Sequence, residues 1–294
     1  MWMRYWKSQR RCKRSGGARL TGRMQGILAA AALFALPFAA AAQERDLAVD
    51  LELVLAVDVS GSIDADEARL QRDGYIAAFS DPEVIRAVSG GMLGRIAVTY
   101  IEWSGARYAQ TIVDWMLIED PASARAFAER LAMAPIQTEL WTSISNAIAF
   151  SMPKFADNRF EGTRKVIDIS GDGPNNQGGL VTAFRDRAVA AGITINGLPI
   201  VNDRAGPWGW PPLPDLDLYY AACVIGGSGS FYVVANSFAD FARAVRQKLL
   251  LEIAGRVPGD GPERIFKAAA RNAERKTPAC DSGERRVQWL LDER

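Results

Sequence analysis

The sequence predicts an α/β fold of three layers: a doubly wound, mostly parallel central sheet with helices on both faces and one antiparallel edge strand. Short β-branched runs alternate with amphipathic helical stretches from Asp50 onward. The first run, 51–59 (LELVLAVDV), is nearly all apolar, which is typical of a strand buried on both faces. Such alternation gives parallel strands whose connecting helices cover both faces of the sheet.

The first half of the chain contains three predicted strands and three predicted helices. The strands are 51–59, 95–103 and 110–117, and the last two are close enough in sequence to form an antiparallel pair. Acidic residues open the first predicted helix, where they suit the positive end of the helix dipole. The helices are predicted at 64–79, near 122–132, and at 143–155.

The second half continues the same alternation and ends in a tail. Strands are predicted at 165–170, 194–200 and 231–235, and helices at 180–191, 216–224 and 238–253. A Gly-rich stretch at 255–261 is typical of a linker. The charged tail beyond it, with a short helix at 262–273, is predicted to be peripheral.

The N-terminus has the pattern of an export signal. Residues 1–42 hold eight basic groups and no acidic one, and 24–43 is an uncharged run rich in Ala and Leu that ends in Ala40-Ala41-Ala42. A basic leader, an apolar core and small residues at the end predict a secretory signal peptide that is cut after Ala42. The alternative is an uncleaved anchor, but about 16 apolar residues span only about 24 Å of a hydrocarbon core of about 30 Å, and Pro37 interrupts them.

These boundaries divide the chain into a signal peptide at 1–42, a domain at 48–254, and a linker with a charged C-terminal tail at 255–294. The exported protein is expected in the periplasm or outside the cell, without a membrane span. Without the leader's eight basic groups, 27 basic and 34 acidic groups remain, a net charge of −7. An acidic surface argues against a nucleic-acid partner.

The chain has no histidine, which excludes Ser-His-Asp and Cys-His catalysis and zinc proteases of the HExxH type. With only three Cys, a metal would be held by oxygen atoms, as magnesium and calcium are. Export would leave Cys223 and Cys280, which an oxidising compartment could join in a disulfide. The sequence leaves open whether their Cα atoms come within reach.

Three loops at predicted strand ends and helix starts carry oxygen side chains. Asp58-Val59-Ser60-Gly61-Ser62 follows the first strand, Trp141-Thr142-Ser143 opens a helix, and 170–176 (SGDGPNN) places Asp172 between two glycines. Taken singly, these residues are also typical of helix caps and turns. Together they place two carboxylates and three hydroxyls at the sheet edge where α/β proteins bind ligands.

This order of motifs, DxSxS, then Thr, then Asp in a Gly-rich turn, resembles the metal-ion-dependent adhesion site of the von Willebrand factor type A domain family. The similarity extends over 48–254 and is with secreted bacterial members that carry the SGDGPNN turn. The resemblance implies that Ser60, Ser62 and Thr142 coordinate a divalent cation, Mg²⁺ or else Mn²⁺ or Ca²⁺, and that Asp58 and Asp172 bind it directly or through water. It also implies an open position for an Asp or Glu carboxylate of a protein or peptide partner.

One loop departs from the family pattern, since this chain has ELWTSIS where many relatives have two glycines before the Thr. Thr138 and Ser143 are therefore alternative hydroxyls. Residues expected to contact the partner are Trp103, Asn175, Asn176, Trp208 and Trp210, whereas Trp115 is expected to pack within the domain.

The predicted function is a binding module and not an enzyme. A metal-dependent hydrolase of phosphoesters is one alternative, but aspartyl-phosphate transfer needs Asp-x-Asp, and the third position here is Ser60. The sequence also lacks the GxxxxGK[ST] phosphate loop and the GxSxG elbow. The other alternative is a structural domain with an unused metal site.

Overall fold

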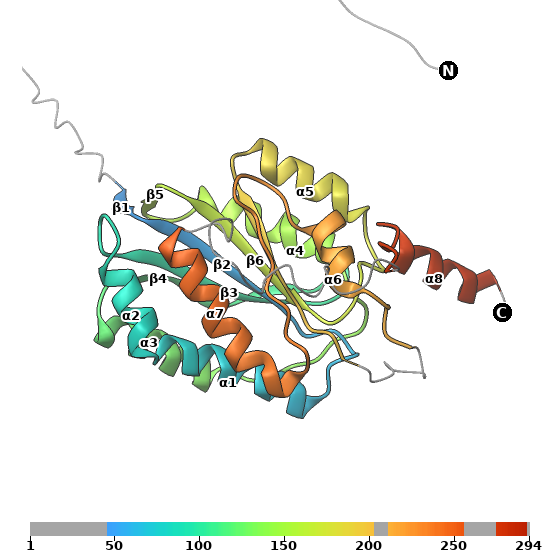
Figure 1. Ribbon diagram of the computed structural model, residues 1–294, viewed down its shortest axis with the longest axis horizontal. Helices are drawn as coiled ribbons and strands as arrows, with labels where there is room; N and C mark the ends of the chain where they lie inside the picture. The colour runs from blue at the N-terminus through green and yellow to red at the C-terminus, as the bar shows by residue number, and fades with distance from the viewer. Residues whose placement is uncertain (1–45, 203–210, 256–274, 293–294) are drawn as a thin grey trace, which may run out of the picture. The chain divides into compact units, whose positions relative to one another are not determined.

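The computed structural model describes residues 46–202, 211–255 and 275–292, all within the compact unit Glu44–Arg294. Five strands form its central sheet in the order β4-β3-β2-β6-β7 (Figure 1). They are β2 (Leu51–Asp58), β3 (Ile96–Trp103), β4 (Ala109–Ile118), β6 (Lys165–Gly171) and β7 (Thr194–Pro199). All neighbours pair in parallel except β3 with the edge strand β4, so the predicted fold class is confirmed.

Helices cover both faces of this sheet (Figure 1). One face packs against α1 (Ala65–Phe79), α2 (Pro82–Ser89), α3 (Pro121–Met133) and α7 (Phe241–Ala254), which follows a short 3₁₀ helix, η4 (Phe238–Asp240). The other face packs against α4 (Ile144–Ser151), extended by η1 (Met152–Phe155), and against α5 (Val181–Ala190) and α6 (Leu216–Tyr219), which continues as the π-helix η3 (Tyr220–Val224).

The central strand β2 shows why the sequence folds in this way. Leu53 and Leu55 point into one hydrophobic cluster, while Val54 and Ala56 point into the other. Side chains alternate across a strand, so only a continuous apolar run can fill both clusters. Each fully buried Leu or Val contributes about 1.5–3 kcal/mol of transfer free energy.

Capping residues fix the helix starts on the first face. The Asp64 side chain accepts hydrogen bonds from the backbone N–H groups of Asp66 and Glu67, and Glu67 accepts from Asp64 N in return. This capping box begins α1 where the sequence predicts it. Helix α2 is not predicted, although Asp81 caps it and Pro82 stands in its first turn, which is a recognised start signal.

The predicted strand at 231–235 is wrong in detail. The segment runs parallel to β7 but forms only two isolated bridges, Gly197–Tyr232 within β7 and Ile200–Ala235 directly after it. Pro199 lies between the two bridges and has no backbone N–H to donate, so the hydrogen-bond ladder is interrupted there. Strands β1 (Leu47–Val49) and β5 (Phe160–Gly162) form a separate parallel pair that is too short for periodicity to reveal.

The C-terminal tail is attached to the domain and is not peripheral. Cys223 and Cys280 form a disulfide, with Cα atoms 5.4 Å apart, which settles the question that the sequence leaves open. The described part of the tail contains helix α8 (Ser282–Asp292), which is not predicted. The predicted signal peptide at 1–42, the short helix at 262–273, and Trp208 and Trp210 lie outside the described residues. None of the described helices is both long and apolar enough to cross a lipid bilayer.

Candidate metal site

The topology of the sheet brings the first and last motifs together. Strand β2 ends at Asp58, and its neighbour β6 ends at Gly171, directly before Asp172. From β2 the chain continues to β3 on one side and later returns to β6 on the other. The carboxyl ends of β2 and β6 therefore flank a switch point, the place where open α/β sheets bind ligands.

Short hydrogen bonds connect the predicted ligands of these two strands. Asp58 Oδ1 accepts a 2.7 Å hydrogen bond from Ser60 N, which folds the DxSxS segment back over the strand end. The Oγ atoms of Ser60 and Ser62 are 3.3 Å apart, and Ser62 Oγ donates to Asp172 Oδ1 at 2.6 Å. The structure thus gathers two carboxylates and two hydroxyls from two loops.

The third loop is joined to the site through Asn176. Its Oδ1 accepts from Thr142 N at 2.8 Å, and its backbone N–H donates to Thr142 O at 2.8 Å. Thr142 Oγ1 lies 3.8 Å from the point that a Cβ on Gly173 would occupy, so this hydroxyl faces the Asp172 loop. Of the alternatives, Ser143 is fully buried as the N-cap of α4, and Thr138 is exposed on the preceding loop.

The Asp58 carboxylate is withdrawn from water, Asp172 is half-buried, and their two charges repel each other. Asp58 is fully buried, and its Oδ2 has no hydrogen-bond partner. Burial, assisted by the negative charge of Asp172, raises the pKa of Asp58 well above its usual value. Burial also raises the pKa of Asp172 to about 6, although the hydrogen bond from Ser62 opposes this rise.

These residues fit a hard divalent cation. Among the described residues, no group of three or more carboxylate, His or Cys side chains is placed to hold a metal, so a site here depends on hydroxyl ligands. Asp58, Ser60, Ser62, Thr142 and Asp172 supply oxygen atoms only. Mg²⁺ prefers six oxygen ligands and keeps several waters. The unpartnered Asp58 Oδ2 is the feature that such a cation would satisfy.

Two further residues lie beside the carboxylates, and neither is among the predicted ligands. The Tyr220 hydroxyl is buried without a hydrogen-bond partner, and it lies with Asp58 Oδ2 against Gly171. Asn202 follows β7 at the same sheet edge, and its Nδ2 donates to Asp172 Oδ2 at 3.4 Å. The position of Asn202 after a strand is a signal that could have identified it, whereas Tyr220 comes from a helix and has none.

Two predicted partner contacts are wrong because their side chains are inside the domain. Trp103 is fully buried in the cluster under α4, and Asn175 is fully buried, where its Oδ1 accepts from Ser145 N at 3.0 Å. Asn176 is half-buried and holds the Thr142 backbone. Trp115 packs as predicted, with its ring centroid 5.8 Å from that of Phe155.

Comparison with protein families identifies the chain. The model of the family described as "Protein of unknown function (DUF1194)" matches residues 48–257. The chain belongs to this family. No curated protein matches this DUF1194 chain.

Solved structures share the fold of this DUF1194 protein. The pilus adhesin SpaC from Lactobacillus rhamnosus GG, in an open conformation, matches with a TM-score of 0.52 and 15% identity, over 72% of this chain and 31% of that chain. A von Willebrand factor type A protein from Catenulispora acidiphila has a TM-score of 0.48 and 14% identity, with 70% and 43% covered. Proximal thread matrix protein 1 from the mussel byssus was solved with a zinc-occupied MIDAS (metal-ion-dependent adhesion site) motif. It has a TM-score of 0.47 and 14% identity, with 71% of this chain and 49% of that chain covered. This chain therefore spans less than half of each of these longer chains.

Gly171 provides a test of how closely this DUF1194 site is packed. A Cβ at this position would lie 2.8 Å from Asp58 Oδ2 and 2.9 Å from the Tyr220 hydroxyl. We expect Gly171→Ala to destabilise the fold by about 1–3 kcal/mol, because packed groups must move apart. The matched control is Gly173→Ala, whose Cβ would meet nothing closer than 3.8 Å. Urea unfolding of both variants makes the comparison, and equal stabilities would contradict the close packing at Asp58.

Proposed function

We propose that this DUF1194 protein is an exported binding module and not an enzyme. It would hold Mg²⁺, or Mn²⁺ or Ca²⁺, at Asp58, Ser60, Ser62, Thr142 and Asp172, and bind a protein or peptide partner through an Asp or Glu carboxylate. The observation that carries the proposal concerns Asp58, which is fully buried near the carboxylate of Asp172. Its Oδ2 has no hydrogen-bond partner. A buried polar atom without a partner calls for an explanation, and a bound ion is one.

The residues have distinct parts in this proposal. Asp58 and Asp172 supply negative charge, while the hydroxyls of Ser60, Ser62 and Thr142 supply neutral oxygen atoms. A bound cation would relieve the repulsion between the carboxylates and offer a Lewis-acidic position to an incoming carboxylate. The two carboxylates would balance the double positive charge of the cation, and the partner's carboxylate would occupy the open coordination position.

Export is supported by two features at opposite ends of the chain. The N-terminal residues 1–42 combine a basic leader with an apolar run, as secretory signals do. The Cys223–Cys280 disulfide is of the kind that persists in the periplasm or outside the cell.

We propose Trp208, Trp210 and the half-exposed Leu140, two residues before Thr142, as apolar contacts for the partner.

The test uses peptides in place of the unidentified partner. A mixture of random heptapeptides with a central Asp is passed over the immobilised protein in Mg²⁺, and a matched mixture carries a central Asn. We expect the Asp mixture to be enriched on the protein and released by EDTA. Equal retention of the Asn mixture, or retention that EDTA leaves unchanged, would contradict carboxylate binding through a cation.

A further inference from the structure

We infer that the disulfide-linked C-terminal segment, residues 275–292, is a positioning element of the candidate metal site. Its residue Glu284 holds the loop that follows Asp172 and is hydrogen-bonded to the Thr142 backbone. The Cys223–Cys280 disulfide holds the segment in place. This inference rests on the proposed function and adds residues that the motifs do not contain. Residues 275–292 lie outside the part of the chain that matches the family model, 48–257.

The loop that the tail contacts carries one candidate ligand and is hydrogen-bonded to the backbone of another. Asp172 lies at its start, and Asn176 holds the Thr142 backbone through two hydrogen bonds of 2.8 Å. Asn175 stands between them and is fully buried. Any displacement of Asn175 would therefore change the separation of the Asp172 carboxylate and the Thr142 hydroxyl.

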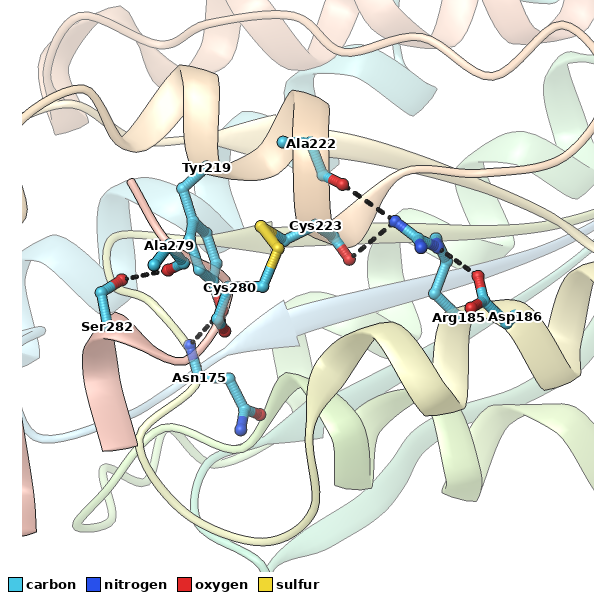
Figure 2. The surroundings of a disulfide bond; sticks show 9 residues. All are labelled: Asn175, Arg185, Asp186, Tyr219, Ala222, Cys223, Ala279, Cys280 and Ser282. Carbon is cyan, nitrogen blue, oxygen red and sulfur yellow. Dashed lines mark hydrogen bonds and ion pairs between the residues drawn. A yellow bond between two sulfur atoms is a disulfide. The ribbon is translucent and has the colours of Figure 1, made fainter. Parts of the chain in front are cut away.

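Three contacts fix Asn175 to the tail and to the helix that the tail is bonded to. Its Nδ2 donates to Glu284 Oε1 at 2.7 Å. Its backbone N–H donates to the Tyr219 hydroxyl at 3.2 Å (Figure 2). A Cβ on Gly283 would lie only 2.0 Å from Asn175 O, so the start of α8 rests directly on this backbone. Only glycine allows so close an approach.

The disulfide also connects residues 275–292 to the helical segment α6–η3, which carries Tyr219 and Tyr220. Figure 2 shows Cys280 bonded to Cys223, which lies on η3, and the Tyr219 hydroxyl between Asn175 and the Cys280 backbone. That hydroxyl donates to Cys280 O at 3.4 Å. The next residue, Tyr220, places its hydroxyl against Gly171 together with Asp58 Oδ2. One covalent bond thus links the tail to residues beside both carboxylates.

The experiment compares variants of Glu284 in the exported protein, purified with its disulfide intact. Mg²⁺ is titrated by calorimetry into wild type, Glu284→Ala and Glu284→Gln. We expect Glu284→Ala to weaken Mg²⁺ binding about tenfold, the usual size of an effect from a residue that orients a ligand. Glu284→Gln keeps an acceptor for Asn175 and is expected to bind as wild type does. The control is Arg285→Ala, which removes only an exposed ion pair with Asp281 and is expected to bind Mg²⁺ as wild type does.

Hydrogen exchange and reduction give independent readouts. Glu284→Ala, and wild type in which the disulfide has been reduced, should both lose protection at the amides of Asn175 and Asn176. Weakened Mg²⁺ binding in Glu284→Gln equal to that in Glu284→Ala would show an effect of charge and overturn the positioning role. Unchanged Mg²⁺ binding in Glu284→Ala, with wild type binding Mg²⁺, would overturn the inference and leave the proposed function standing. Failure of wild type to bind Mg²⁺ would overturn both.

Discussion

Asp58→Asn is expected to make the metal-free protein more stable while abolishing its stabilisation by Mg²⁺. The wild-type carboxylate is fully buried, lacks a partner for Oδ2 and is close enough to Asp172 for the two charges to repel. The amide of Asn is neutral, keeps an acceptor for Ser60 N, and can donate to the nearby Tyr220 hydroxyl. Removing an unsatisfied buried charge should add about 1–3 kcal/mol to the free energy of unfolding in EDTA.

Urea unfolding in EDTA and in Mg²⁺ measures both effects. Wild type should gain about 2.7 kcal/mol when free Mg²⁺ is about 100 times its Kd, and Asp58→Asn should gain nothing. The control is Asp73→Asn, an exposed position on α1, which should behave as wild type does in both conditions. A variant that is less stable than wild type in EDTA, or that keeps the full response to Mg²⁺, would contradict this account of Asp58.

Lys248→Met is expected to destabilise the fold more than Gly171→Ala does. Lys248 is fully buried on α7, with Nζ 2.6 Å from Asp168 Oδ1 and in an ion pair with Glu252. Methionine fills a similar volume but leaves two buried carboxylates without their cation. Breaking a buried ion pair by removing one partner costs about 3–5 kcal/mol.

The control for Lys248 comes from the same helix. Arg246 forms ion pairs with Asp81 and Glu83 at the surface, and Arg246→Met should cost far less, because water replaces the lost contacts. Adding Asp168→Asn to Lys248→Met should recover part of the loss, since burial and Glu252 already raise the pKa of Asp168 to about 7. Equal unfolding free energies for the Lys248 and Arg246 variants would contradict the claim that Lys248 stabilises the buried carboxylates of Asp168 and Glu252.

Asp168 also connects this buried network to the candidate site. It lies on β6 four residues before Asp172, and the strand runs directly from one carboxylate to the other. A weakened network would loosen the strand that carries Asp172. We therefore expect the Lys248 variant, where it remains folded, to bind Mg²⁺ less tightly than wild type.

The sequence predicts those parts of the fold that repeat a pattern over several residues. The apolar run at 51–59 identifies the central strand because both of its faces are buried. Asp64 and its neighbours identify the start of α1 because capping is local. Elements of three residues, such as β1 and β5, are too short for either signal. The interruption beside Pro199 depends on a partner strand, which the local sequence does not show.

The candidate site likewise contains residues that the sequence predicts and residues that it does not. Asp58, Ser60 and Ser62 are adjacent in sequence, and Asp172 follows the neighbouring strand, so topology alone brings them together. Trp103 ends a strand and is therefore predicted to contact the partner, but its ring turns into the core under α4. Tyr220 and Glu284 reach the site region from helices, and only tertiary packing places them there.

The central claim, that this site holds a divalent cation, is tested most directly by crystals of the protein soaked in Mn²⁺. Anomalous scattering should show one strong peak bounded by Ser60, Ser62 and Thr142, with Asp58 and Asp172 in contact with it directly or through water. The same peak should be absent from crystals of Asp58→Asn. An empty site at saturating Mn²⁺, or a peak that persists in the variant, would contradict the claim.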